Sequence, residues 1–312
     1  MKYFTIGKNK IELPKLSIGC LRITEISMKD TEKLIMTAMQ NGANHFDNAD
    51  IYGGYGTCEE LMATAISNLK LKREDYMIQT KCGISNEKSR YFTTHDWSKK
   101  HIMDAVEGSL KRLNTDYIDT LLLHRYDPLM IPEEVAEAFD TLYDSGKVKS
   151  FGVSNQNPWQ TDFIKKYIKQ ELIVNQMQFS IMHTGMIDSG IYVNMKNEQS
   201  ILHDGGVMEY ARLNDMAIQA WSPYQYGMFE GTFMNNDKFP ELNQLLDRIA
   251  EKYSVTDTAI ATAWILRLPV KMQVVTGTTK ASRLNEICSG SDIELTRDEW
   301  YEIYAAAGNI MP

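Results

Sequence analysis

The stretch Ile118-Asp119-Thr120-Leu121-Leu122-Leu123 indicates most directly how this chain folds, because it forms a short, mainly apolar run typical of a buried strand. From Pro132 to Ser145 apolar residues recur every three or four positions, which predicts a helix. Pro132 suits the first turn of that helix, and Gly146 suits the left-handed position past its end. A second buried run, Ser150-Phe151-Gly152-Val153, follows. This order predicts a β–α–β unit.

The same alternation continues along the whole chain. The other apolar runs cover 16–19, 43–46, 76–80, 173–177, 217–221 and 272–276, which makes eight with the two above. Further helical patterns cover 30–41, 59–69 and 99–113. Eight β–α repeats predict an α/β fold of the closed (β/α)8 TIM-barrel type, since a doubly wound sheet of eight strands lacks that symmetry. No linker-like or low-complexity stretch interrupts the pattern, so we expect residues 1–312 to form a single domain.

Two features extend the repeating pattern. An N-terminal β-hairpin is predicted, in which residues 3–6 pair with 11–13 across the turn Gly7-Lys8-Asn9-Lys10. Long segments follow the third, sixth and seventh strands, at 84–97, 179–205 and 225–240. Segments that follow strands lie at the C-terminal face of a barrel, where barrel enzymes place their chemistry. We therefore expect long βα loops around the functional site.

The composition is that of an ordinary globular protein, with 43% hydrophobic and 24% charged residues. A formal net charge of −8 argues against a nucleic-acid partner, which would select a basic face. No run approaches the roughly 20 apolar residues of a membrane span, and the N-terminus alternates like a strand instead of resembling a signal peptide. A cytoplasmic protein, monomeric or weakly homo-oligomeric, is expected. The scattered cysteines and histidines predict neither disulfides nor a metal site.

Polar side chains stand at the ends of the second, third and fourth predicted strands. Asp47 and Tyr52 follow the second strand, Lys81 the third and His124 the fourth. Taken singly, each has an ordinary explanation as a helix cap, a solvated lysine or a hydrogen-bonded structural histidine. Because the strand ends of a barrel converge on one mouth, we expect these four residues to be neighbours.

Together these four residues suit proton donation to an oxygen that becomes an alcohol. A tyrosine has an ordinary pKa of about 10, too high for rapid proton exchange near neutrality. A nearby lysine would lower the pKa of Tyr52, and a carboxylate paired with Lys81 would keep that lysine charged. A neutral His124 donating to a substrate carbonyl would polarise it. Such machinery needs a hydride donor.

The order of these residues resembles the catalytic tetrad of the aldo-keto reductase superfamily. The family's other blocks are matched by Gly146-Lys147-Val148-Lys149-Ser150-Phe151-Gly152-Val153-Ser154-Asn155, Asn175-Gln176, Trp221-Ser222-Pro223-Tyr224, and Thr276-Gly277-Thr278-Thr279-Lys280 with Arg283. The resemblance runs from the hairpin to about Ile287. It implies an NADPH-dependent oxidoreductase that reduces aldehydes or ketones, with Tyr52 as general acid.

No Gly-x-Gly-x-x-Gly motif follows a strand, so the sequence does not support a Rossmann-type cofactor site. The resemblance implies instead that NADPH (NADP+) lies extended across the barrel mouth. It places Ser154, Asn155 and Gln176 at the nicotinamide carboxamide, Trp221 on the nicotinamide ring, and Ser222 and Tyr224 along the pyrophosphate. The whole implied set is Gly19, Cys20, Leu21, Asp47, Ser154, Asn155, Gln176, Trp221, Ser222, Pro223, Tyr224, Gly277, Thr278, Thr279, Lys280, Arg283 and Ile287.

The block after the eighth strand favours NADPH over NADH. Thr278, Thr279, Lys280 and Arg283 offer two hydroxyls and two cations at the start of a helix, which suits a 2′-phosphate. The alternative is that the two cations are solvated charges of a first helical turn.

The sequence departs from the family pattern at two of these positions. Leu21 stands where many members have a tryptophan beside the nicotinamide, which widens the pocket wall. Ile287 stands where members often have an asparagine that faces the adenine.

The substrate pocket is predicted to be mainly apolar, lined by Leu21, Tyr55, Trp97, Tyr126, Met182, Tyr226, Met228 and Phe229. The alternative, at least equal in weight for each residue, is that it packs the long loops down. Arg22 and Arg125 also lie near the mouth and are possible ligands for an anionic group. For Arg125 we favour a structural role in which Asp127 or Asp50 neutralises it. The sequence does not identify the substrate beyond a small-molecule carbonyl compound.

Two competing functions remain to be weighed. Potassium-channel β subunits resemble this family, so a cofactor-holding regulatory or binding subunit is the alternative to an active reductase. The sequence contains nothing like a basic N-terminal inactivation segment, which argues against the subunit. A barrel enzyme with metal-dependent chemistry is disfavoured because no ligand cluster is evident.

Overall fold

The computed structural model describes residues 1–85 and 93–312. Eight parallel strands form a closed barrel in the order β3, β4, β5, β8, β9, β10, β11 and β12, with β12 pairing back to β3. Their bounds are β3 Leu16–Gly19, β4 His45–Asp47, β5 Met77–Cys82, β8 Ile118–Leu123, β9 Val148–Ser154, β10 Leu172–Gln178, β11 Ala217–Trp221 and β12 Met272–Thr276. This confirms the (β/α)8 TIM barrel.

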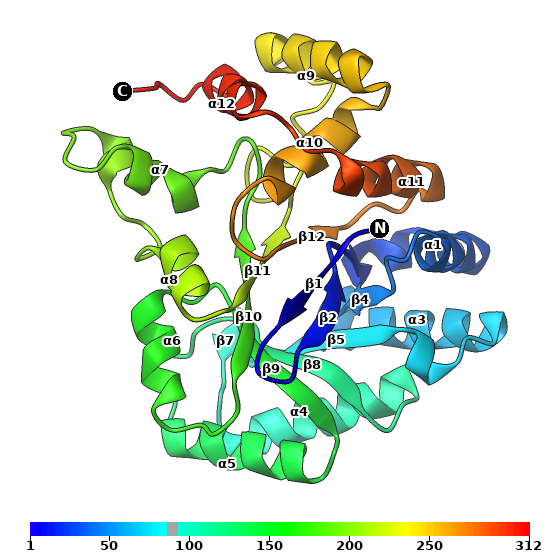
Figure 1. Cartoon of the computed structure of the whole chain (residues 1–312). Helices are drawn as coiled ribbons and strands as arrows, with labels where there is room; N and C mark the ends of the chain where they lie inside the picture. The colour runs from blue at the N-terminus through cyan, green and yellow to red at the C-terminus, as the bar shows by residue number, and fades with distance from the viewer. Residues whose placement is uncertain (86–92) are drawn as a thin grey trace.

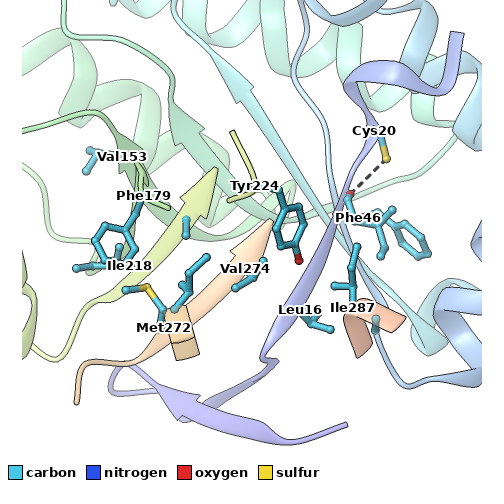
Figure 2. Packing of buried hydrophobic residues seen from close by; sticks show 14 of the residues in the cluster. Leu16, Cys20, Phe46, Val153, Phe179, Ile218, Tyr224, Met272, Val274 and Ile287 are labelled. Atoms are coloured by element: carbon cyan, nitrogen blue, oxygen red, sulfur yellow. Dashed lines mark hydrogen bonds between the residues drawn. The ribbon is translucent and has the colours of Figure 1, made fainter. Parts of the chain in front are cut away.

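Helices surround the barrel in chain order, from α1 on the right of Figure 1 through α5 at the bottom and α9 at the top to α11 at the upper right. The bounds of the longer helices are α1 Met28–Gln40, α3 Thr57–Leu69, α4 Lys99–Leu113, α5 Pro132–Asp144, α6 Pro158–Lys165, α9 Pro240–Tyr253, α10 Asp257–Leu266, α11 Ala281–Ser289 and α12 Arg297–Ala306. Apolar faces of these helices pack on the strands, and Figure 2 shows part of this core. Pro132 occupies the first turn of α5, and Gly146 past its end has φ +73°, as predicted.

The predicted N-terminal hairpin is present and covers one end of the barrel. It consists of β1 (Tyr3–Ile6) and β2 (Ile11–Pro14), which pair antiparallel. Ile6 and Leu13 are buried in one apolar cluster with Ile173 and Ala217, which lie at the beginnings of β10 and β11. The hairpin therefore closes the N-terminal end of the barrel and leaves the C-terminal end as the mouth.

The segments predicted as long loops contain short elements of their own. β6 (Ile84–Ser85) pairs with β7 (Thr94–His95) after β5, but residues 86–92 of that loop lie outside the described residues. The loop after β10 contains α7 (Gly185–Ile191), the 3-10 turn η3 (Glu198–Ser200) and α8 (Val207–Leu213). The other short elements are α2 (Tyr52–Tyr55) and the 3-10 turns η1 (Cys20–Glu25), η2 (Arg73–Asp75) and η4 (Gly290–Asp292).

A chain of glutamine amides crosses the interior of the barrel. The Gln219 amide donates to Oε1 of Gln79 at 2.9 Å and to Oε1 of Gln273 at 2.7 Å, and its own oxygen accepts from Gln176 at 2.9 Å. Gln273 donates in turn to the carbonyl of Pro14 in the hairpin, at 2.7 Å. All four glutamines are buried. The amides satisfy one another, so this polar layer is compatible with a dry interior.

Among the described residues, no helix combines the length and apolar character needed to cross a membrane.

Candidate active site

Tyr52 is positioned by the loop that continues from β4. This loop remains hydrogen-bonded to β5, because the Asn48 amide donates to the Gln79 carbonyl at 2.8 Å and the Asp50 amide to the Lys81 carbonyl at 3.1 Å. Immediately after Tyr52 the backbone of Gly53 adopts φ +70°. A Cβ at this glycine would lie 3.0 Å from Cys58 Sγ and from Thr24 Cγ2. Both the conformation and the lack of space therefore select glycine beside the tyrosine.

Lys81 joins Asp47 to Tyr52. Its Nζ lies 2.8 Å from each carboxylate oxygen of Asp47 and 3.1 Å from the hydroxyl of Tyr52. A third hydrogen bond, of 2.7 Å, goes to the backbone carbonyl of Asn48. Lys81 is fully buried, so its charge is stabilised only by these partners. The sequence placed Lys81 after its strand, whereas β5 extends to Cys82 and includes it.

The electrostatics of this chain differ from the expectation in one respect. Burial lowers the pKa of Lys81, but Asp47 and Tyr52 outweigh it, so the net direction is upward and the lysine remains charged. The pKa of Tyr52 is raised above its ordinary value, because burial raises it more than the Lys81 charge lowers it. Lys81 lowers the Tyr52 pKa as predicted, but the expectation that the net pKa lies below its ordinary value was wrong, because burial outweighs the lysine. The Tyr52 hydroxyl holds its proton at neutral pH.

His124 lies beside Tyr52, with the two rings edge-to-face and their centroids 6.0 Å apart. Its backbone N–H donates to the Cys82 carbonyl at 2.9 Å, which continues the pairing of β8 with β5 beyond the strand end. Burial, followed by the charge of Lys81, holds the pKa of His124 well below its usual range. Its imidazole is therefore neutral near pH 7. The Nδ1 atom of this ring is buried without a partner among the described residues.

A cavity of about 430 Å³ opens at this group of side chains. Tyr52, His124 and Asp47 line it together with the residues expected around the nicotinamide. Those residues also contact one another: Trp221 Nε1 donates to Asn155 Oδ1 at 3.1 Å, and Asn155 Nδ2 donates to Ser154 Oγ at 2.8 Å. Gln176 Nε2 donates to Asp47 Oδ1 at 3.1 Å and so connects the two halves of the site.

Another group of residues that line the same cavity is suited to a phosphate. Gly277, Thr278 and Arg283 line it, and a Cβ at Gly277 would meet no atom within 4 Å, so the backbone there is open to a ligand. Arg283 forms no ion pair with the described carboxylates. The guanidinium and the open backbone therefore suit a phosphate group. Gly19, Leu21, Ser222 and Pro223 line the cavity as well, as expected.

Four residues predicted to bind the cofactor lie outside the lining of this cavity. Cys20 and Ile287 are buried in the apolar core, as Figure 2 shows. Thr279 and Lys280 immediately precede α11, outside the lining. Tyr224 lines the cavity, and its hydroxyl is hydrogen-bonded to Thr262 at 2.8 Å. Cofactor contacts at these positions stay predictions, because a motif fixes a position in the chain and not the direction of a side chain.

The predicted substrate pocket is likewise only partly present. Leu21, Met228 and Phe229 line the cavity. Trp97 is fully buried, edge-to-face with Tyr126 at 5.8 Å, and is a core residue. Tyr55 is 47% exposed and does not line the cavity. Tyr126, Met182 and Tyr226 are also absent from the lining. Lining residues that the sequence analysis missed are Ile51, Ile84, Gln225, Thr232, Met234 and Val275. Most of these residues lie in the long βα segments that were predicted to form the mouth. Their place in those segments is the sequence signal that could have identified them as lining residues.

The fold and this group of side chains define a (β/α)8-barrel protein whose titratable residues meet at the C-terminal mouth of the barrel. The family model described as "Aldo/keto reductase family" matches residues 15–307, and the chain belongs to this family of oxidoreductases. Members of the family typically use a nicotinamide cofactor.

Individual relatives agree with this assignment. The chain is 32% identical over 307 residues to the 6-dehydroglucose reductase of Agrobacterium fabrum, with 96% of each chain covered. It is 26% identical to a probable voltage-gated potassium channel subunit beta of Oryza sativa subsp. japonica, with 94% of this chain and 92% of that protein covered. Among solved structures, the thermostable aldo-keto reductase Tm1743 has a TM-score of 0.76 at 23% identity. That match covers 98% of this chain and 100% of the other, and it supports the fold.

Proposed function

We propose that this chain is an NADPH-dependent reductase that converts aldehydes or ketones into alcohols, with Tyr52 as the proton donor. The observation that carries the proposal is the position of Lys81 Nζ, 2.8 Å from Asp47 and 3.1 Å from the Tyr52 hydroxyl at a cavity wall. A lysine is costly to bury, and a chain of titratable groups that runs from the buried Asp47 and Lys81 to the partly buried Tyr52 at a cavity is typical of catalytic sites.

Each residue has a distinct role in this mechanism. The substrate oxygen lies between the Tyr52 hydroxyl and the neutral imidazole of His124, which orients and polarises the carbonyl. Tyr52 gives its proton to that oxygen, and the Lys81 charge stabilises the resulting phenolate. Asp47 keeps Lys81 charged and in place.

The cofactor supplies a hydride from its nicotinamide ring when it is bound. Ser154, Asn155 and Gln176 would hold the carboxamide of that ring, and Trp221 would stack on its face. The open backbone at Gly277 and the guanidinium of Arg283 would hold the phosphate end.

The substrate is proposed to be a small carbonyl compound. The Agrobacterium relative is named for the reduction of 6-dehydroglucose, which makes 6-dehydroglucose a first compound to test with this chain. A cofactor-holding regulatory subunit is the second candidate, and it is favoured by the similarity to the potassium-channel subunit.

One experiment separates these two candidates. Purified protein is given NADPH and a panel of aldehydes, ketones and quinones, and NADPH consumption is followed. We expect turnover, and we expect Tyr52→Phe to lower kcat by about 10²- to 10⁴-fold, as loss of a general acid does. Tyr143→Phe, on an exposed face of α5, is the matched control and should keep full activity. Tight NADPH binding without turnover of any carbonyl would favour the subunit instead.

A further inference from the structure

Arg125 lies in the cavity immediately beside the proposed proton donor. It follows His124 after the end of β8 and lines the same cavity as Tyr52. Its guanidinium carbon is 5.9 Å from the centroid of the Trp221 ring, the ring proposed to stack on the nicotinamide. Burial lowers the pKa of Arg125, and the proximity of Tyr52 partly opposes this shift.

No described carboxylate neutralises this guanidinium. The sequence analysis favoured Asp127 or Asp50 as its partner, and the structure contradicts that expectation. The Asp127 carboxylate accepts hydrogen bonds from the backbone N–H of Trp97 at 2.9 Å and of Leu129 at 2.8 Å. Asp50 forms no ion pair with Arg125 either. A half-buried cation without a protein partner is costly unless a ligand supplies the opposite charge.

The balance of charge around the cavity points the same way. Its described lining contains three arginines, Arg22, Arg125 and Arg283, and a single carboxylate, Asp47, which Lys81 already neutralises at 2.8 Å. The whole chain has a net charge of −8, so the positive charge of the cavity lining is opposite in sign to the net charge of the protein. Arg283 is assigned to the cofactor, which leaves Arg22 and Arg125 without a role.

We propose that the carbonyl substrate carries a carboxylate, which Arg125 binds through its planar guanidinium, with Arg22 as a second cation. This inference rests on the proposed function and adds the class of substrate to it. A guanidinium presents two parallel N–H donors that match the two oxygens of a carboxylate. Met228, Phe229 and Met234 line the remaining wall, and they suit an apolar body between the carboxylate and the carbonyl.

The test compares 4-carboxybenzaldehyde with its neutral analogue methyl 4-formylbenzoate, both with NADPH. We expect the wild-type protein to favour the carboxylate in kcat/KM by about tenfold or more, mainly through KM, which corresponds to about 1.4 kcal/mol. Arg125→Met should reduce this preference at least about tenfold, and Arg125→Lys, which keeps the charge but not the planar fork, should retain part of it. Arg22→Met should reduce it less. Arg248→Met, on an exposed arginine paired with Glu302, is the control and should leave the preference unchanged.

Calorimetric binding of 4-carboxybenzaldehyde to the NADP+-loaded protein distinguishes failure of this inference from failure of the proposed function. Equal turnover of both aldehydes by the wild-type protein, or a preference that survives Arg125→Met, would overturn the carboxylate assignment and leave the reductase intact. Binding of the carboxylate that depends on Arg125, without turnover of either aldehyde, would support the anion site and contradict the reductase. Absence of both binding and turnover would overturn the inference.

Discussion

The side-chain amide of Gln79 donates a hydrogen bond of 2.6 Å to Oδ1 of Asp47, the carboxylate that holds Lys81. Both residues are buried, and Gln176 donates to the same oxygen at 3.1 Å. The amide chain of the barrel interior therefore ends on the proposed catalytic carboxylate. Hydrogen bonds to a charged carboxylate favour its ionised form and fix its orientation. Gln79 is in this sense a positioning residue for Asp47.

Gln79→Leu should lower kcat by about tenfold and the free energy of unfolding by about 1–3 kcal/mol, because a buried carboxylate loses a donor. Gln273→Leu is the matched control, since it breaks the same amide chain at a residue that contacts Gln219 and Pro14 but forms no hydrogen bond to Asp47. It should cost similar stability and leave kcat nearly unchanged. Steady-state kinetics and urea unfolding check both variants. An equal loss of kcat in the two would mean that Gln79 acts only through stability.

The sequence predicted the barrel well because the signal for each strand is local. Buried strands of a barrel read as short apolar runs, and β8, β11 and β12 have the predicted bounds. Convergence of Asp47, Tyr52, Lys81 and His124 was expected from topology alone, and the four residues do meet. The direction of a side chain does not follow from such patterns. Ile287 and Cys20 were assigned by position in a motif, yet each points into apolar packing that many distant residues create together.

The glutamine chain was also beyond prediction from the sequence. Gln219 and Gln273 stand as single polar residues between apolar neighbours, and Gln79 precedes Thr80 in its strand; a sequence pattern cannot distinguish these glutamines from ordinary interruptions. Their meaning arises only when the barrel closes and brings amides from separate strands within 2.9 Å of each other.

Replacing Lys81 should act through Tyr52. Lys81→Met removes the cation that opposes the effect of burial, so the pKa of Tyr52 should rise further and kcat should fall by about 10²-fold or more. If the two residues act as one unit, the double variant Lys81→Met with Tyr52→Phe should lower kcat little more than either single variant does. Lys149→Met, which removes a lysine stacked on Tyr117 outside the cavity, serves as the control. Strictly additive losses in the double variant would contradict the coupling.

Arg283 should decide the preference for NADPH. We expect NADPH to be favoured over NADH by about tenfold or more in kcat/KM, the effect of one charged contact to a 2′-phosphate. Arg283→Ala should remove most of this preference and weaken the binding of adenosine 2′,5′-bisphosphate, a fragment whose affinity does not depend on turnover. Lys280→Ala should have the smaller effect, because Lys280 lies outside the cavity lining. Arg297→Ala, an exposed arginine of α12, is the control. Equal use of both cofactors would disprove this role of Arg283.

Asp50 should make the stability of the protein depend on pH. It lies in the loop that positions Tyr52, and its Oδ1 is buried without a hydrogen-bond partner among the described residues. Burial, followed by the carboxylate of Glu59, raises the pKa of Asp50 to about 7. A carboxyl group whose pKa is raised on folding stabilises the folded state fully below the ordinary pKa of about 4. This contribution is lost as the pH rises through about 7, because the folded protein must then hold an unfavourable buried charge.

Asp50→Asn should therefore stabilise the protein at pH 8 relative to the wild type, by a free energy on the order of 2–4 kcal/mol, since each unit of pKa shift is worth about 1.4 kcal/mol. At pH 5 the difference should be much smaller, because the wild-type carboxyl is then protonated in the folded state. Urea unfolding of both proteins between pH 5 and pH 8 measures this difference directly. Asp237→Asn, at an exposed carboxylate, should leave the wild-type pH dependence as it is. If Asp50→Asn is no more stabilising at pH 8 than at pH 5, the carboxylate is ionised in the folded protein throughout this range and its charge is satisfied.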